Sequence, residues 1–194
     1  MKENHFFAMM SRMKLIDRWG LMRNTIKEND SEHSLDVAMI AHALGVINNV
    51  YFDGNIDANR LALMGMYHDA IEIITGDIPT PIKYHSDEVR TAFREVERVA
   101  KNSLVEGLPP ELRQIYAPLL VETEEEKELW RYVKAADKLS AYIKCIEEQR
   151  MGNVDFAIAL DSIKNIIDNL NMPEVDLFMA KFIPAYSLTL DELK

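Results

Sequence analysis

Residues 64–81 read MGMYHDAIEIITGDIPTP, and this stretch places four ionisable side chains in or directly behind an apolar run. His68 and Asp69 are adjacent, Glu72 follows three residues after Asp69, and Asp77 stands shortly before two prolines. A buried carboxylate is costly unless it is paired with a cation or binds a metal ion. The stretch therefore indicates a functional site and not an ordinary core helix.

The rest of the chain predicts an all-α fold. Apolar residues recur at helical spacing nearly everywhere, and alternating strand patterns are nearly absent. No repeat, low-complexity tract or flexible linker divides the chain, so residues 1–194 are expected to form a single domain. Asp30 and Ser31 are the expected N-caps of the second helix, and Gly76 the residue that ends the third. The predicted helices span residues 3–17, 30–49, 57–76, 87–106, 109–122, 124–152, 154–170 and 174–183.

Composition limits the partners and the location of the protein. The formal net charge of -10 argues against a general binder of nucleic-acid polymers or of anionic membrane surfaces, but it leaves room for a small anion in a locally cationic pocket. The longest apolar run, residues 37–47, is shorter than the roughly 18 residues that a membrane span needs. The amino-terminal segment lacks the apolar region of a signal peptide, and Cys145 has no second cysteine to pair with. We therefore expect a cytoplasmic protein.

Four side chains of metal-ligand type fall in three predicted helices: His33, His68, Asp69 and Asp137. Neighbouring residues on a helix point about 100° apart, so His68 and Asp69 can both reach an ion only if it lies beside their helix. A single buried histidine is more often a hydrogen-bonded core residue than a ligand. Asp137 is harder to explain without a cation, although a salt bridge to Lys134 or Lys138 is the simpler alternative.

The order of these four residues resembles the H…HD…D pattern of the HD-domain metal-dependent phosphohydrolases. Within that superfamily, the chain is similar to the bacterial 5′-deoxynucleotidases over essentially its full length. Five segments carry the resemblance: HFFAMMSRMKLIDRWGLMRN (5–24), SEHSLDVAMIAHAL (31–44), MYHDAIEIITGDIPTPIKY (66–84), AADKLSAYIKCIEE (135–148) and DLFMAKFIPAYSLTLDEL (176–193).

The resemblance implies a fold, a reaction and a cofactor. The fold would be a helical HD bundle, the chain a homodimer, and the reaction hydrolysis of 2′-deoxyribonucleoside 5′-monophosphates to deoxynucleoside and phosphate, with ribonucleotides excluded. One divalent cation would be held by the four residues named above, of which His33, Asp69 and Asp137 would also contact substrate. Nitrogen and carboxylate ligands suit cobalt, manganese or zinc better than calcium, but they do not choose among those metals.

The resemblance also suggests roles for residues around the ligands. Glu72 is the best candidate to orient or deprotonate the attacking water, and Asp77 could protonate the leaving 5′ oxygen, although the two roles could be exchanged. Arg18 would bind the phosphate and act in catalysis, with Arg23 as a second phosphate candidate. Trp19 would leave no room for a ribose 2′-hydroxyl. The nucleotide-contacting segment would be Asp77, Ile78, Pro79 and Thr80.

Two other functions are compatible with these patterns. One is a different HD phosphohydrolase, such as a triphosphohydrolase or a hydrolase of signalling nucleotides; the small size and the Arg18–Trp19 pair argue against it. The other is a nucleotide-binding module that has lost catalysis. All four ligands and Glu72 are present, which favours an enzyme, because clustered ionisable groups are typical of active sites.

Overall fold

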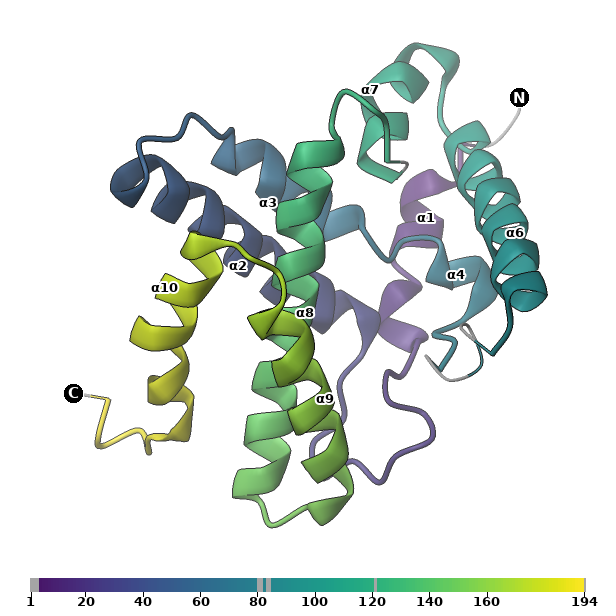
Figure 1. Cartoon of the computed structure of the whole chain (residues 1–194). Coiled ribbons are helices and arrows are strands. Elements are labelled where there is room, and N and C mark those ends of the chain that lie inside the picture. Colours follow the sequence, from purple (N-terminus) through teal and green to yellow (C-terminus); the bar gives the residue numbers. More distant parts are fainter. Residues whose placement is uncertain (1–3, 80–81, 83–84, 121, 194) are drawn as a thin grey trace.

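A computed structural model describes residues 4–79, 82, 85–120 and 122–193. Over these ranges the chain forms helices and no β-strand, with one isolated antiparallel bridge between Asp17 and Asn29 (Figure 1). This confirms the predicted all-α class. None of the helices described there is both long enough and apolar enough to cross a membrane. The order of elements is α1 (Phe6–Met10), η1 (Met13–Leu15), α2 (Asp30–Tyr51), α3 (Ala58–Tyr67), α4 (Glu72–Thr75), α6 (Asp87–Glu106), α7 (Pro110–Leu120), α8 (Lys127–Arg150), η2 (Val154–Phe156), α9 (Ala157–Asp168), α10 (Pro173–Lys181) and η3 (Ile183–Ser187).

The helices form two groups with separate cores. In Figure 1, α8 runs through the middle of the molecule, with α2, α3 and α9 packed against it, α10 packed on α2, and α1, α6 and α7 on the other side. The larger core includes Leu44, Met64 and Leu139, and the smaller one includes Phe6 and Ala70. The segment from Met64 to Ala70 therefore runs from one core to the other, and the His68–Asp69 pair lies at their junction.

The second helix is central, as predicted, but it begins differently from the prediction. The N-cap is Asn29, whose side chain accepts hydrogen bonds from the backbone N–H groups of Ser31 and Glu32, while the Glu32 carboxylate accepts the Asn29 N–H. This capping box satisfies the free N–H groups of the first turn. Asp30 is consequently the first helical residue and not a cap, and its side chain is completely buried.

A close approach of two helices determines the spacing at the site. Gly65 in α3 packs directly on Ala38 in α2, and a methyl group on Gly65 would lie 2.7 Å from the Ala38 Cα atom. Only glycine leaves room for such a contact. The approach brings the first turn of α2 next to the end of α3, where His33 and His68 lie with ring centroids 5.2 Å apart.

The prediction of one continuous helix over residues 57–76 is wrong, because the helix is interrupted in its middle. α3 ends at Tyr67, a turn covers residues 68–71, and a single helical turn, α4, follows. Backbone bonds in the turn span three residues, for example from Ala70 N–H to the Tyr67 carbonyl at 3.0 Å. The tighter turn changes the directions of His68 and Asp69, which would point about 100° apart on a continuous helix.

The other helices agree with the prediction to different degrees. α6 has the predicted bounds and is a surface helix, with Ala100 and Leu104 as its buried residues. The predicted helix 3–17 is instead the short α1 followed by η1, with Ser11 as the C-cap residue of α1 and its hydroxyl bonded to the Ala8 carbonyl. The predicted helix 154–170 begins as η2 before α9. The remaining helix ends lie within a few residues of the prediction.

Candidate active site

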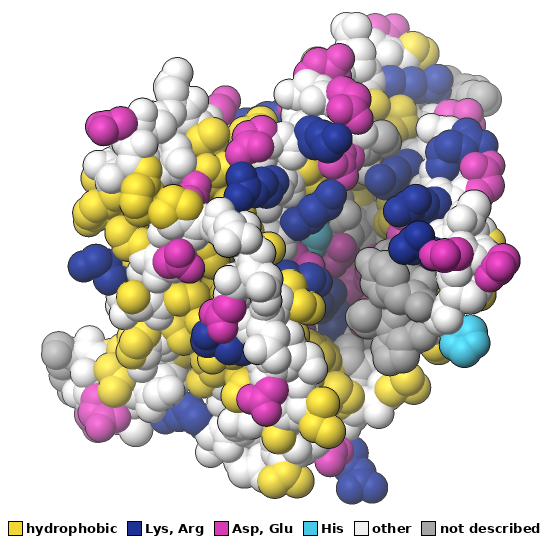
Figure 2. Space-filling view, in the orientation of Figure 1, with side chains coloured by type: hydrophobic (Ala, Val, Ile, Leu, Met, Phe, Trp, Pro, Cys, Tyr) yellow, Lys and Arg dark blue, Asp and Glu magenta, His cyan; other side chains and the backbone are white. Residues whose placement is uncertain are grey.

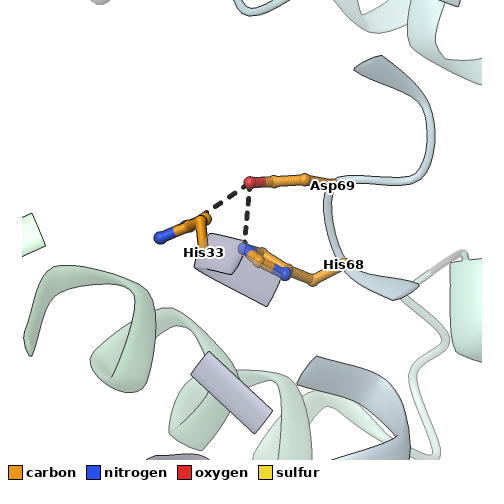
Figure 3. Close-up of side chains that lie close together, drawn as sticks. All are labelled: His33, His68 and Asp69. Atoms are coloured by element: carbon orange, nitrogen blue, oxygen red, sulfur yellow. Dashed lines mark ion pairs between the residues drawn. The ribbon is translucent and has the colours of Figure 1, made fainter. Parts of the chain in front are cut away.

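Three ionisable side chains from two helices converge at the junction of the cores. His33 comes from the first turn of α2, and His68 and Asp69 follow the last residue of α3 (Figure 3). The Asp69 Oδ2 atom lies 3.1 Å from His68 Nε2 and 3.5 Å from His33 Nε2. The ligand atoms of the three residues all lie within 4.8 Å of one another, a spacing that could hold one metal ion.

The Nδ1 atom of each histidine makes a hydrogen bond that fixes the orientation of the ring. His68 Nδ1 lies 2.8 Å from the Gly65 carbonyl oxygen, which can only accept, so Nδ1 carries the proton and donates it. His33 Nδ1 bonds the Ser140 hydroxyl at 3.1 Å. His68 Nε2 is buried and lies against the Asp69 carboxylate, and no donor is bonded to it among the described residues. A metal ligand needs a free Nε2 of this kind, and partners on Nδ1 are typical of metal-binding histidines.

Asp137 adds a second carboxylate from α8. Its Oδ1 atom lies 3.1 Å from His33 Nε2, and its Oδ2 atom accepts a hydrogen bond from Lys138 Nζ at 2.8 Å. The alternative salt bridge to Lys138 is therefore present. Asp137 also lies against His33, but it is not one of the three side chains whose ligand atoms lie within 4.8 Å of one another, and its role as a ligand stays a prediction. Burial alone would raise the pKa of Asp137, but the bond to His33 and the charge of Lys138 hold it well below its usual value.

The cluster has the charge that a divalent cation requires. Burial raises the pKa of Asp69, but the charge of His68 and its hydrogen bond outweigh this effect and lower the pKa to about 2. Asp69 and Asp137 are therefore both ionised at neutral pH. Two carboxylates and two imidazoles form a mixed nitrogen and oxygen set, so the residues fit a transition-metal ion or zinc.

Glu72 lies beside a second buried carboxyl group that was not predicted to belong to the site. Burial, with the charges of Asp69 and Asp30, raises the pKa of Glu72 to about 10. Burial and Asp69 likewise raise the pKa of Asp30 to about 7, and its side chain interacts with Glu72. Both carboxyl oxygens of Asp30 and the Glu72 Oε2 atom are buried without a hydrogen-bond partner in the described part of the chain. The pair therefore shares a proton or faces a cation.

Arg18 joins the loop before α2 to the metal-ligand cluster. Its Nη1 atom donates to Asp69 Oδ2 at 3.2 Å, and its Nε atom donates to Glu28 Oε2 at 3.3 Å. Trp19 Nε1 donates to the same Glu28 oxygen at 2.9 Å, and the Trp19 ring lies 5.2 Å from that of Phe156. Arg23, the second phosphate candidate, is exposed, and its backbone carbonyl oxygen accepts a hydrogen bond from Asn153 Nδ2.

The segment after α4 turns back towards the site. Gly76 has φ +73°, a conformation that favours glycine, so its predicted role in ending the helix is confirmed. Asp77 is half-buried, and its charge contributes to the raised pKa values of Asp30 and Glu72. Ile78 and Pro79 are also half-buried and follow it. Thr80, the last predicted nucleotide contact, lies outside the described residues.

Comparison with known proteins identifies the family. The family model described as "5'-deoxynucleotidase YfbR-like" matches residues 5–186. The chain belongs to the YfbR-like 5′-deoxynucleotidase family. A curated relative named 5'-deoxynucleotidase YfbR from Shigella boydii is 49% identical, with 100% of this chain and 97% of the relative covered. The relative of the same name from Salmonella paratyphi B is also 49% identical over the same shares of both chains.

Solved structures give the same fold. An HD-domain phosphohydrolase from Listeria innocua superposes with a TM-score of 0.78 at 25% identity, covering 94% of this chain and 88% of its own. The HD phosphohydrolase DatZ of cyanophage S-2L, solved with dA and one catalytic zinc ion, superposes with a TM-score of 0.62 at 18% identity, covering 91% and 95%. The predicted HD-type helical fold of this family is therefore confirmed.

Two acidic residues of this YfbR-like chain were missed by sequence reasoning. Asp30 was interpreted as a cap, although Asn29 directly before it is an equally good cap and leaves Asp30 free to point inward. Glu28 was not considered, because an acid in a polar loop gives no periodic signal. The two bonds that Glu28 accepts from Arg18 and Trp19 depend on folding of the loop, which the sequence pattern does not show.

Proposed function

We propose that this chain is a metal-dependent enzyme that hydrolyses 2′-deoxyribonucleoside 5′-monophosphates to deoxynucleoside and phosphate and discriminates against ribonucleotides. The observation that carries the proposal is the convergence of His33, His68 and Asp69, with a buried free His68 Nε2, in a chain 49% identical to proteins named 5'-deoxynucleotidase. The whole chain acts as one HD domain in this proposal.

His33, His68, Asp69 and Asp137 would hold one divalent cation. When bound, the cation offsets the charge of the phosphate, polarises a phosphoryl oxygen and makes water more acidic. The mixed ligand set supports zinc, manganese or cobalt and argues against calcium. DatZ, which shares the fold, was solved with zinc.

The acidic side chains next to the cluster would move protons. Glu72 takes the proton of the attacking water, because a carboxylate with a raised pKa is a stronger base once it is ionised. A cation at the neighbouring ligands favours that ionised form. Asp77, in its protonated form, donates that proton to the leaving 5′ oxygen and becomes ionised, since an alkoxide is a poor leaving group.

Arg18 and Trp19 would select the substrate. Arg18 has only 12% of its side chain exposed and already contacts the cluster through Asp69, so it can bind a phosphate that lies on the metal. The Trp19 side chain would fill the space next to the 2′ position of the sugar. A ribose 2′-hydroxyl there would be buried without a partner, and such a group costs about 1–3 kcal/mol. Ile78, Pro79 and the preceding Asp77 would contact the nucleotide, as would Thr80.

The surface around the site supports an anionic substrate. Figure 2 shows Lys and Arg side chains gathered around a hollow between α8 and the α6–α7 side, with acidic side chains at its floor. The chain as a whole carries a net charge of -10, so this cationic rim is a local feature. Such a rim attracts a small phosphorylated molecule, whereas the overall charge repels nucleic-acid polymers.

We further propose a cytoplasmic homodimer. An apolar hollow of about 960 Å³ lies over α2, α10 and the carboxy-terminal segment. Exposed apolar side chains gathered in one place are a feature of protein–protein contacts. Its lining includes Val46, Val50, Tyr51, Phe182 and Leu188. A monomer at micromolar concentration in light scattering would contradict the dimer.

The decisive experiment is phosphate release from dAMP, AMP, dATP and a cyclic dinucleotide. The protein is stripped with a chelator and then supplied with zinc, manganese or cobalt separately. We expect release from dAMP and much less from AMP. Faster release from dATP or the dinucleotide would favour another HD hydrolase, nucleotide binding without release would favour a non-catalytic module, and equal rates on AMP and dAMP would refute the role of Trp19.

A further inference from the structure

The loop that carries Arg18 and Trp19 is closed at its base by backbone bonds. Arg18 N–H donates to the Glu28 carbonyl at 3.0 Å, and Asp30 N–H donates to the Ile16 carbonyl at 3.1 Å. The antiparallel bridge between Asp17 and Asn29 lies between these bonds. Residues 18–28 therefore form a loop whose two ends are fixed against the start of α2.

Trp19 is held in this loop in an unfavourable backbone conformation. Its φ is +58°, in the left-handed region, which costs a non-glycine residue about 1–3 kcal/mol. The Glu28 carboxylate fixes the indole N–H and the Arg18 guanidinium through one oxygen atom. A conformation of this kind persists only where the surroundings enforce it, so the position of Trp19 depends on what fixes the rest of the loop.

A buried glutamate on α8 fixes the far side of the loop. Glu148 is 1% exposed, and its carboxylate accepts bonds from Thr25 N–H at 2.9 Å and Ile26 N–H at 3.1 Å. Lys144 Nζ donates to Glu148 Oε1 at 2.5 Å and also to the Ile26 carbonyl. Asn153 Nδ2 donates to Glu148 Oε2 at 2.7 Å. Four donors therefore meet on one carboxylate.

The charge state of Glu148 suits this role. Burial raises its pKa, but the hydrogen bonds from Lys144 and Asn153 and from the backbone of the loop outweigh burial and lower it to about 2. The carboxylate is therefore ionised at any working pH, and its bonds to N–H groups are charge-assisted. α8 also carries Asp137, so one helix supports both the metal-ligand cluster and the loop.

We propose that Glu148 is a positioning residue that sets the selectivity for deoxyribose by holding the loop of residues 18–28 on α8. It touches neither substrate nor metal ligands, and acts through Glu28 on Arg18 and Trp19. The proposal rests on the proposed function only for its kinetic consequence. The placement of Trp19 can be tested without turnover.

The test compares Glu148→Gln with Glu147→Gln, the same change at the exposed neighbouring residue of α8. Glutamine keeps the size but turns an amide donor towards the donors of the loop. For Glu148→Gln we expect the ratio of kcat/KM for dAMP over AMP to fall about tenfold, mainly through KM for dAMP, because small displacements of a positioning group have large effects. Affinity for zinc, measured by titration calorimetry, stays unchanged. Glu147→Gln behaves as the unmodified protein in every assay.

A fluorescence measurement reports the loop itself. In a Trp130→Phe background, Trp19 is the only tryptophan, and its quenching by acrylamide should increase in Glu148→Gln. Unchanged quenching or an unchanged dAMP/AMP ratio in the folded variant overturns the proposal, as does an equal effect of Glu147→Gln. If the unmodified protein releases no phosphate from dAMP, the proposed function fails, and quenching alone decides the role of Glu148.

A second variant covers the case in which Glu148→Gln does not fold. Asn153→Asp keeps the oxygen that accepts the Asp155 N–H at the start of η2, but replaces the amide donor to Glu148 by a second carboxylate. We expect it to raise Trp19 quenching and lower the dAMP/AMP ratio in the same direction. A folded Asn153→Asp protein with neither change overturns the proposal.

Discussion

Replacing Asp30 by asparagine should stabilise the metal-free protein at high pH. Asp30 is completely buried beside Glu72, and its pKa is raised from 3.8 to about 7. Below pH 3.8 the carboxyl group is protonated in the folded and the unfolded protein, and the substitution is nearly neutral. Between pH 3.8 and about 7 the unfolded chain releases a proton that the folded protein retains, so the wild type loses stability as the pH rises.

The size of the effect follows from that pKa. Each pH unit corresponds to about 1.4 kcal/mol, so the upper bound for Asp30 is about 4 kcal/mol. Because the asparagine amide is itself a polar group that is costly to bury, we expect Asp30→Asn to gain roughly half of this, about 2 kcal/mol at pH 8, or roughly 4–8 °C in Tm. The amide that the substitution introduces could also donate a hydrogen bond to Glu72.

Chemical unfolding at pH 4, 6 and 8 in the presence of a chelator measures this prediction. The matched control is Asp161→Asn, an aspartate exposed on α9. The reasoning is refuted if Asp30→Asn is no more stable than the wild type at pH 8, or if its advantage is the same at every pH. An equal gain in Asp161→Asn would show that the effect is one of net charge.

Substitutions at four further positions test the site and its supports. Asp69→Ala should lose both zinc and activity, as measured by metal content and phosphate release. Glu72→Gln should keep zinc and lose about 10²–10⁴-fold in kcat. Normal turnover of Glu72→Gln would contradict the role of Glu72 as the base. Gly76→Ala forces a side chain into positive φ and should cost about 1–2 kcal/mol by urea unfolding, together with a loss of activity; an unchanged midpoint would mean that the turn adapts. Asn29→Ala removes the cap of α2 and should cost about 1 kcal/mol, while Asn29→Ser should cost less.

The parts of the fold that depend on periodicity were predictable from the sequence. α6 was predicted with its observed bounds because its apolar and charged faces are clearly separated, and α2 was predicted as central because it has no wide polar face. The break after Tyr67 was not predictable in this way. Residues 57–76 have good helical periodicity throughout, and that pattern does not show the bond from His68 Nδ1 to the Gly65 carbonyl that accompanies the turn.

For the site, residue type was more informative than local position. Histidine and aspartate in apolar segments are rare enough to stand out, and His33, His68 and Asp69 do converge. Acids in polar surroundings give no such signal, so the partners of Glu28 and the burial of Asp30 became visible only in three dimensions. Long-range contacts of loops decide these positions, and no pattern within a short stretch of sequence encodes them.

The glycine contact between α2 and α3 has a consequence for metal choice. Gly65 allows the two helix backbones to approach closely, and its carbonyl group orients His68, so this residue without a side chain sets the separation of the two imidazoles. A methyl group at this position would push α3 away from Ala38 and widen the gap between the ligands. The distance between the two helices would then select the metal ion by its radius. A protein that keeps the same ligands would change its metal through a residue that never touches the ion.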